Sequence, residues 1–188
     1  MSAVTPELIL SAYHQGYFPM ASGRRGDIEF YYFEPRAIIP LDERFTVRPS
    51  LRKIIESGRF ETTIDTSFEE VIRSCARYEE LPDKEIWISE EMIVLYCELH
   101  RRGIAHSVET WRDQELVGGL YGLALGNVFC GESMFSKQSY ASQIALVKLV
   151  EWLRENKFRV LDAQMESEHL KQFGAYAISQ AEYLELLS

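Results

Sequence analysis

The feature that most constrains the fold is a series of three apolar runs in the second half of the chain, at residues 107–111, 115–123 and 128–133. Two short segments, 112–114 and 125–127, separate these runs and carry the Asp, Asn and Gly residues that tight turns favour. Runs of strand length joined by such turns are typical of β-hairpins. The spacing therefore predicts an antiparallel meander of three strands.

A helix and a further strand are expected after the meander. Apolar residues recur at helical spacing along one side of the segment 140–156, where Ile144, Leu149 and Trp152 share a face. Residues 159–164 form a short, largely apolar run of the strand type. Strands followed by a helix–strand crossover predict an α+β domain with a mixed sheet and flanking helices.

The first half of the chain is expected to form a small N-terminal lobe over residues 1–85, with the main domain over 86–188. Thr5 before Pro6 indicates a helix from there to about residue 15. Two capping-box patterns, Ser67-x-x-Glu70 and Ser179-x-x-Glu182, each predict the start of a helix. The remaining expected elements are helices at 48–57 and from Ser89, and strands at 29–33, 60–64 and 176–178.

Charge and cysteine content exclude several classes of protein. The net charge of −9 argues against a general nucleic-acid binder, because phosphate contacts need Lys and Arg. A local basic patch stays possible, and the charge would suit a cationic substrate. Three cysteines with no C-x-x-C pair predict neither a disulfide framework nor a zinc site. The sequence shows no secretory signal or membrane-spanning run, so we expect a cytoplasmic protein.

Three polar residues stand out as candidates for chemistry. Glu132 follows an apolar run at the end of a predicted strand, where a partly buried carboxylate needs a partner or a purpose. Asp162 and Gln164 lie two apart on an apolar strand, and a period of two places both on one face. The alternatives are an ordinary surface acid for Glu132 and a solvated strand tip for the other pair.

Other reactive residue types have simpler interpretations. His106 opens the first strand of the meander, but no serine or cysteine stands near it in a nucleophile motif, so we interpret it as structural. Cys130 is expected in the core, since the neighbouring Glu132 would raise the pKa of its thiol. Glycines at 118, 119 and 122 interrupt a strand and indicate a bulge or a close approach of backbone.

Four ordered motifs together resemble the leucyl/phenylalanyl-tRNA–protein transferase family. They are Ala105-His106-Ser107-Val108-Glu109, Leu116-Val117-Gly118-Gly119-Leu120-Tyr121-Gly122, Phe129-Cys130-Gly131-Glu132-Ser133-Met134-Phe135-Ser136 and Asp162-Ala163-Gln164. Shorter matches, including Phe18-Pro19, Pro35-Arg36 and Trp87-Ile88, extend the resemblance over nearly the whole chain. The resemblance implies a GNAT-like catalytic domain over 86–188.

The resemblance also implies an activity. Members of this family move Leu, Phe or sometimes Met from an aminoacyl-tRNA to the α-amine of a protein that begins with Arg or Lys. The product is marked for degradation by the N-end rule pathway. The expected partners are therefore a charged tRNA and a protein with a basic N-terminal residue. No metal, dissociable cofactor or membrane is implied.

Site residues follow from the resemblance motif by motif. Asp162 and Gln164 would lie at the catalytic centre. Gln164 would position the amine and relay its proton, and Asp162 would either polarise Gln164 or take the proton itself. Glu132 would hold the cationic acceptor. The apolar pocket for the donor side chain is assigned to Met134, Leu120 and Phe129, the adenosine contacts to Trp87 and Tyr31, and tRNA binding to Arg48, Arg52, Lys53 and Arg59.

Two rival functions stay open on the same fold. A coenzyme-A-dependent N-acetyltransferase needs a glycine-rich pyrophosphate loop between strand and helix. The corresponding stretch, residues 136–141, contains no glycine, which argues against that function. A non-enzymatic module that binds protein N-termini through Glu132 is the second rival, and the presence of Asp162 and Gln164 argues against it.

Overall fold

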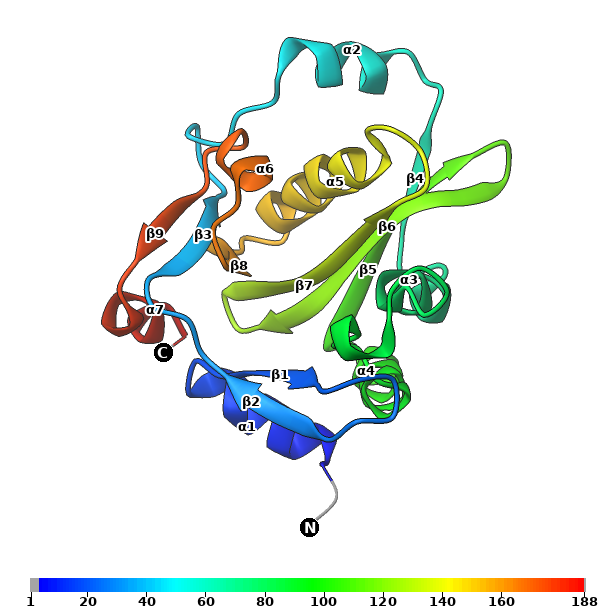
Figure 1. The fold of residues 1–188 in the computed structure, drawn as a ribbon. Coiled ribbons are helices and arrows are strands. Elements are labelled where there is room, and N and C mark those ends of the chain that lie inside the picture. Colours follow the sequence, from blue (N-terminus) through cyan, green and yellow to red (C-terminus); the bar gives the residue numbers. More distant parts are fainter. Residues whose placement is uncertain (1–3, 188) are drawn as a thin grey trace.

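A mixed seven-stranded sheet forms the centre of the protein in a computed structural model that describes residues 4–187 (Figure 1). The strands lie in the spatial order β4 (Glu61–Ile64), β5 (Ala105–Arg112), β6 (Glu115–Leu125), β7 (Val128–Ser136), β8 (Val160–Gln164), β3 (Arg36–Pro40) and β9 (Tyr176–Ile178). Only β7 and β8 run parallel. The predicted α+β class with a mixed sheet is therefore confirmed.

Helices cover both faces of this sheet. The α-helices are α1 (Pro6–His14), α2 (Pro49–Glu56), α3 (Phe68–Ala76), α4 (Glu90–Arg101), α5 (Ala141–Glu155), α6 (Glu168–Lys171) and α7 (Gln180–Leu187), with a 3-10 turn at Asp83–Glu85. One apolar core joins α1, α3, α4 and α7 to the sheet, and a second joins α2 and α5 to the opposite face. Successive residues of β6 alternate between the cores, since Leu120 belongs to the second and Tyr121 to the first.

The three-stranded meander forms where the sequence predicted it. Val108 of β5 pairs with Leu120 of β6, and Leu120 pairs in turn with Met134 of β7. The crossover helix α5 then returns the chain to β8, which pairs with β7 only from Val128 to Cys130. Beyond that point the two strands separate, and this separation creates the space in which the candidate site lies.

The N-terminal half contributes both a separate part and two strands of the large sheet. A two-stranded hairpin of β1 (Phe18–Ala21) and β2 (Ile28–Tyr31) packs with α1 below the large sheet in Figure 1. Strands β3 and β4 pair within the large sheet itself. The predicted division at residue 85 stays a prediction. Neither β1 nor β3 is predicted from the sequence, because both strands are short and contain or adjoin proline.

Helix starts agree with the sequence at all four predicted cap positions, and a side-chain cap is present at three of them. The Thr5 and Ser89 hydroxyls accept the amides of Leu8 and Met92 at 3.2 Å each. Ser179 and Glu182 form the predicted capping box, with each side chain accepting the amide of the other residue. The box predicted at Ser67 is wrong.

Although α3 does begin after Ser67, the side chain of Ser67 caps nothing. Its backbone amide instead donates to the buried carboxylate of Glu109, at 3.3 Å. That carboxylate also accepts the hydroxyls of Thr63, Thr66 and Ser107. The donors gathered around Glu109 thus determine the local geometry at the start of α3.

Within residues 4–187, no helix is both long enough and apolar enough to span a bilayer.

Candidate functional site

A β-bulge in β7 aims Glu132 into the space between β7 and β8. Tyr121 of β6 pairs with Ser133, and the next residue, Gly122, pairs with Gly131. Glu132 is therefore an extra residue without a partner on β6, which is the arrangement by which bulges redirect a side chain. Gly122 makes this possible, since a Cβ atom there would lie 2.2 Å from the Cys130 oxygen and 2.4 Å from the Phe129 ring.

Replacing Gly122 by alanine is expected to lower the free energy of unfolding by about 1–3 kcal/mol, the usual cost of overpacking. Gly126→Ala is the comparison, because its φ of +57° carries a backbone cost of about 1 kcal/mol but its Cβ would meet nothing within 4 Å. Urea unfolding of both variants measures the difference. Equal midpoints, together with unchanged activity of Gly122→Ala, would contradict this account of the bulge.

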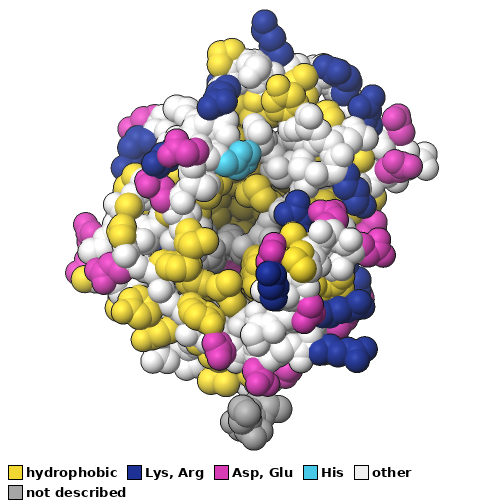
Figure 2. All heavy atoms as spheres, in the orientation of Figure 1, with side chains coloured by type: hydrophobic (Ala, Val, Ile, Leu, Met, Phe, Trp, Pro, Cys, Tyr) yellow, Lys and Arg dark blue, Asp and Glu magenta, His cyan; other side chains and the backbone are white. Residues whose placement is uncertain are grey.

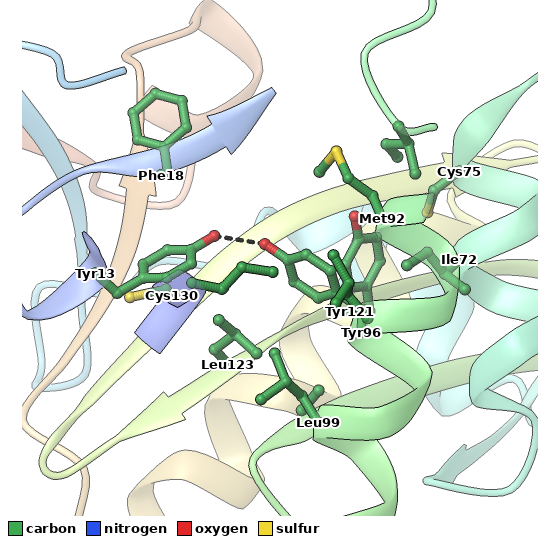
Figure 3. Packing of buried hydrophobic residues seen from close by; sticks show 14 of the residues in the cluster. Tyr13, Phe18, Ile72, Cys75, Met92, Tyr96, Leu99, Tyr121, Leu123 and Cys130 are labelled. Carbon is green, nitrogen blue, oxygen red and sulfur yellow. Dashed lines mark hydrogen bonds between the residues drawn. The ribbon is translucent and has the colours of Figure 1, made fainter. Parts of the chain in front are cut away.

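Glu132 is partly buried and contacts two other polar side chains. Its Oε1 accepts Nε2 of Gln164 at 3.2 Å, and its Oε2 accepts the Tyr96 hydroxyl at 3.4 Å. The Tyr96 hydroxyl also lies 2.7 Å from that of Tyr13, the contact drawn as a dashed line in Figure 3. Burial, with a smaller contribution from the charge of Asp162, raises the pKa of Glu132 to about 7.

Asp162 forms a fully buried ion pair with Arg36. Arg36 donates Nε to Oδ1 at 2.9 Å and a second nitrogen to Oδ2 at 2.6 Å, and both side chains are 0% exposed. The Tyr183 hydroxyl donates to Oδ2 at 2.6 Å, and burial raises the pKa of Tyr183, so that hydroxyl stays protonated. Both carboxylate oxygens of Asp162 are therefore fully occupied by donors.

The remaining bond of Asp162 fixes the backbone of Gln164. The Gln164 amide donates to Asp162 Oδ1 at 2.9 Å. Gln164 has a φ of +54°, a left-handed conformation that non-glycine residues rarely adopt. Such a conformation persists only where the surroundings impose it, and here the buried Asp162 does so. The two predicted residues therefore have different tasks. Asp162 holds the backbone of Gln164, and the side chain of Gln164 contacts Glu132.

Two cavities meet at the Glu132–Gln164 pair. The first, of about 140 Å³, is lined by apolar side chains of β6, β7, β8 and α5. Leu120 and Met134, predicted for the donor pocket, both line it, whereas Phe129 does not. Phe129 is fully buried against Trp152 and Phe158, so it supports the core beside the cavity.

The second cavity, of about 390 Å³, has an aromatic wall. It is lined by Phe18, Met20, Phe33 and Trp87 on one side and by residues 163–167 on the other, with Glu132 between them. Trp87, which the resemblance assigns to the adenosine, lines this cavity. Tyr31 is not among the lining residues, but it pairs with Phe18 on the same face of the hairpin, and its hydroxyl donates to Glu29. Figure 2 shows a hollow near the middle of the molecular surface, over the position of β7 in Figure 1.

The four basic residues predicted for tRNA binding lie on or beside α2. Arg48, Arg52, Lys53 and Arg59 are all exposed, and within residues 4–187 none of them forms an ion pair. Lys and Arg side chains at the top of the molecule in Figure 2 mark the same region. The structure thus leaves them available to an anionic partner, at some distance from the Glu132–Gln164 pair.

The other singled-out residues line neither of these two cavities. His106 has its Nδ1 2.7 Å from Asp65 Oδ2 and packs against Trp152. Cys130 is fully buried, and burial raises the pKa of its thiol well above its ordinary value. Within the described part of the chain, no three His, Cys, Asp or Glu side chains are placed to hold a metal ion.

Comparison with known proteins assigns the family. A model described as leucyl/phenylalanyl-tRNA protein transferase matches residues 38–188, and the N-terminal domain model of the same family matches residues 2–32. The chain belongs to the leucyl/phenylalanyl-tRNA–protein transferase family. The resemblance inferred from the motifs is confirmed.

Curated relatives support the assignment over nearly the full length. The leucyl/phenylalanyl-tRNA–protein transferase of Akkermansia muciniphila is 48% identical over 184 residues, which are 98% of this chain and 94% of the relative. That of Herpetosiphon aurantiacus is 50% identical, covering 98% of this chain and 93% of its own. This member of the transferase family is therefore an aminoacyltransferase, with an aminoacyl-tRNA as donor and a protein as acceptor.

A solved structure with little sequence similarity shares the fold of this transferase. The crystal structure of FemX superposes with a TM-score of 0.57 at 11% identity, covering 79% of this chain and 60% of the FemX chain. At that identity the match shows a shared fold and nothing about substrates. The predicted α+β fold with a mixed sheet and flanking helices is thus shared with a solved structure.

Sequence reasoning did not identify the residues that hold the site in place. Arg36, Tyr13, Tyr96 and Tyr183 were assigned no role, yet they contact Asp162 or Glu132 directly or through one hydroxyl. Only Arg36 carried a usable signal. An arginine immediately before the apolar run Ala37-Ile38-Ile39 needs a buried anion if that run is a central strand.

Proposed function

We propose that this protein transfers Leu, Phe or Met from charged tRNA to the α-amine of proteins that begin with Arg or Lys, marking them for N-end rule degradation. The observation that carries this proposal is the Gln164–Glu132 contact of 3.2 Å at the meeting point of an apolar cavity and an aromatic one. A donor with an apolar side chain and a terminal adenosine fits such a pair of cavities. We expect the reaction in the cytoplasm, where charged tRNA is made.

The apolar cavity suits the donor side chain in size and lining. A cavity of about 150 Å³ with apolar walls holds one benzene molecule, so 140 Å³ accommodates a phenylalanine ring or a leucine side chain. In the aromatic cavity, the adenine stacks against Trp87. Because both cavities are lined by Glu132 and Gln164, the ester that joins amino acid to ribose lies beside them.

Gln164 is oriented for contact with the attacking amine. A carboxylate only accepts hydrogen bonds, so Glu132 draws the NH₂ group of Gln164 toward itself, and the amide oxygen faces the other way. That oxygen accepts an N–H of the acceptor amine. A neutral amide is a very weak base, so Gln164 holds the amine in place and does not store its proton.

The bond changes then balance without another reagent. The lone pair of the neutral amine attacks the ester carbonyl, and a tetrahedral oxyanion forms. The bond from that carbon to the ribose oxygen breaks, an amide remains, and the proton lost by the amine ends on the ribose oxygen. Asp162 does not take this proton in our account, since its oxygens are occupied by Arg36, Tyr183 and the Gln164 amide.

Basic residues around α2 complete the donor site in this proposal. Arg48, Arg52, Lys53 and Arg59 are exposed and form no ion pair with any residue among 4–187, so they contact tRNA phosphates at a distance from the chemistry. This local patch reconciles a net charge of −9 with a nucleic-acid substrate. The negative charge elsewhere suits acceptors with basic N-terminal residues.

The activity is expected to fall below neutral pH because Glu132 must be ionised to orient Gln164 and to attract a basic acceptor. Its pKa of about 7 predicts that kcat/KM falls about tenfold for each pH unit below that value. The acceptor amine, with an ordinary pKa of about 7.7–8.0, adds a second dependence of the same sign. A pH profile of the Glu132→Gln variant separates these two pH dependences, since only the one due to the acceptor amine should remain. An unchanged profile in this variant would contradict the role of Glu132.

The acceptor preference is tested with peptides that differ only in their first residue. Peptides beginning with Arg or Lys should be labelled by leucine from charged tRNA, and the same peptides beginning with Ala or Asp should be labelled much more slowly. Equal labelling of all four would contradict the proposed specificity while leaving the transfer reaction intact. Faster labelling of the Asp peptide would show the opposite acceptor preference.

A further inference from the structure

Strand β7 has an open edge beside the candidate site. Its pairing with β8 ends at Cys130 and Asp162, while its pairing with β6 continues to Ser136. From Gly131 to Ser136, no strand among residues 4–187 pairs with the side of β7 that faces away from β6. An unpaired strand edge presents free N–H and C=O groups and is a template for another extended chain.

The ladder with β6 indicates which backbone groups face this open edge. The Lys137 amide donates to the Val117 oxygen at 2.7 Å, so these two residues form a hydrogen-bonded pair. Bonded and non-bonded pairs alternate along an antiparallel ladder. Phe135 and Ser133 therefore turn their backbone groups toward β6, whereas Met134 and Ser136 turn theirs toward the open edge.

The open edge connects the candidate site to a third cavity. Gly131, Glu132, Ser133 and Met134 line the apolar cavity. Phe135 and Ser136 line a different cavity of about 280 Å³, together with Lys137 and residues near the end of α3. Four residues of strand separate Glu132 from Ser136, a distance of about 13 Å. That is the length of an extended peptide of about four residues.

The donor leaves the outer part of this edge to the acceptor, since Phe135 and Ser136 line neither the apolar nor the aromatic cavity. In the proposed function the apolar cavity holds the donor side chain and the aromatic cavity holds the adenosine, so the acceptor must reach the ester from another direction. The edge of β7 begins at Glu132, where the amine must be, and it leads to the third cavity. Figures 1 and 2 place β7 under the hollow in the molecular surface.

We propose that the N-terminal segment of the acceptor protein binds as an extended strand along the open edge of β7, parallel to it. The first residue lies at Glu132, and the next three or four residues run past Met134 and Ser136 to the cavity beyond. This inference rests on the proposed function. Main-chain hydrogen bonds supply the affinity, as in other cases of strand addition.

Strand addition has a consequence for substrate choice. Backbone hydrogen bonds do not depend on side chains, so after the first residue the enzyme should accept most sequences. The segment must, however, be free to adopt an extended conformation over about four residues. A protein whose N-terminus is folded into a helix or buried should be a poor acceptor, even if it begins with Arg or Lys.

N-methylated peptides test this inference without altering the enzyme. A six-residue peptide beginning with Arg is prepared with a single N-methyl group at position 2, 3, 4, 5 or 6. Methylation removes a donor, and a lost backbone bond should lower kcat/KM about fivefold to tenfold. Because alternate residues of an added strand face β7, the losses should occur at every second position among 2–5 and be absent at 6.

Two outcomes overturn the inference. One is equal rates for all five methylated peptides, and the other is an equal rate for two-residue and six-residue acceptors. Either result leaves the proposed function intact, because the unmodified peptide is still labelled. Failure to label any peptide would instead count against the proposed function.

Hydrogen exchange supplies an independent measurement that needs no transfer. The unmodified peptide at saturating concentration should slow exchange of the Met134 and Ser136 amides. The Ser133 and Phe135 amides, which bond to β6, should change little. Protection of all four amides to the same degree, or of none, would contradict pairing at this edge even if the peptide binds elsewhere.

Discussion

Replacing Arg36 by methionine is expected to lower the free energy of unfolding by about 3–5 kcal/mol. Arg36 and Asp162 are both 0% exposed and joined by two hydrogen bonds, of 2.9 Å and 2.6 Å. Methionine would leave the Asp162 carboxylate buried without its counter-charge, and desolvation of an unpaired charge is costly. Denaturant unfolding of the variant measures the loss.

A double variant separates the stability of the fold from the geometry of the site. Arg36→Met with Asp162→Leu removes both charges, and apolar replacement of a buried pair is often neutral or stabilising. Much of the lost stability should therefore return. Transfer should not, because the Gln164 amide loses its acceptor at 2.9 Å. A stable double variant with full activity would contradict the positioning role of Asp162.

Replacing Gln164 by glycine is expected to lower kcat for transfer about a hundredfold or more, the usual loss when the group that positions the nucleophile is removed. Glycine adopts a φ of +54° without cost, so the backbone turn and its bond to Asp162 should persist. Single-turnover transfer from charged tRNA measures the effect on chemistry.

Stability distinguishes two substitutions at this position. Gln164→Ala removes the same amide but keeps the strained backbone, so it should match Gln164→Gly in activity and be the less stable of the two. Gln15→Ala, which removes an exposed glutamine just after α1 whose side-chain amide donates to the Ser11 carbonyl, is the control for unspecific effects. Transfer by Gln164→Gly at more than a tenth of the normal rate would contradict the assigned role.

The parts of this structure that depend on local pattern were predictable. The meander from β5 to β7 follows from strand-length runs separated by turn residues, and α5 from its apolar face. Glycine at 122 indicated a bulge or close approach, and the bulge at Glu132 lies opposite it. The strand β3 escaped prediction, because only four residues lie between Pro35 and Pro40, and they carry too short a pattern.

The geometry of the site depends on contacts that no local pattern encodes. Gln164 and Glu132 are 32 positions apart, and Arg36 and Asp162 are 126 apart. The same-face argument for Asp162 and Gln164 assumed an extended strand, whereas the left-handed turn at Gln164 directs its side chain to Glu132. Family motifs brought these residues together, and only the fold assigns them different tasks.

The most direct test of the central claim is a donor comparison with the unaltered protein. The enzyme is given an Arg-starting peptide with labelled leucyl-tRNA, the same tRNA after RNase treatment, or labelled acetyl-CoA. We predict leucine transfer in the first mixture, its loss in the second and no acetylation in the third. Acetylation without leucine transfer would identify an acetyltransferase, and peptide binding without any transfer would identify a binding module; either result would contradict the account.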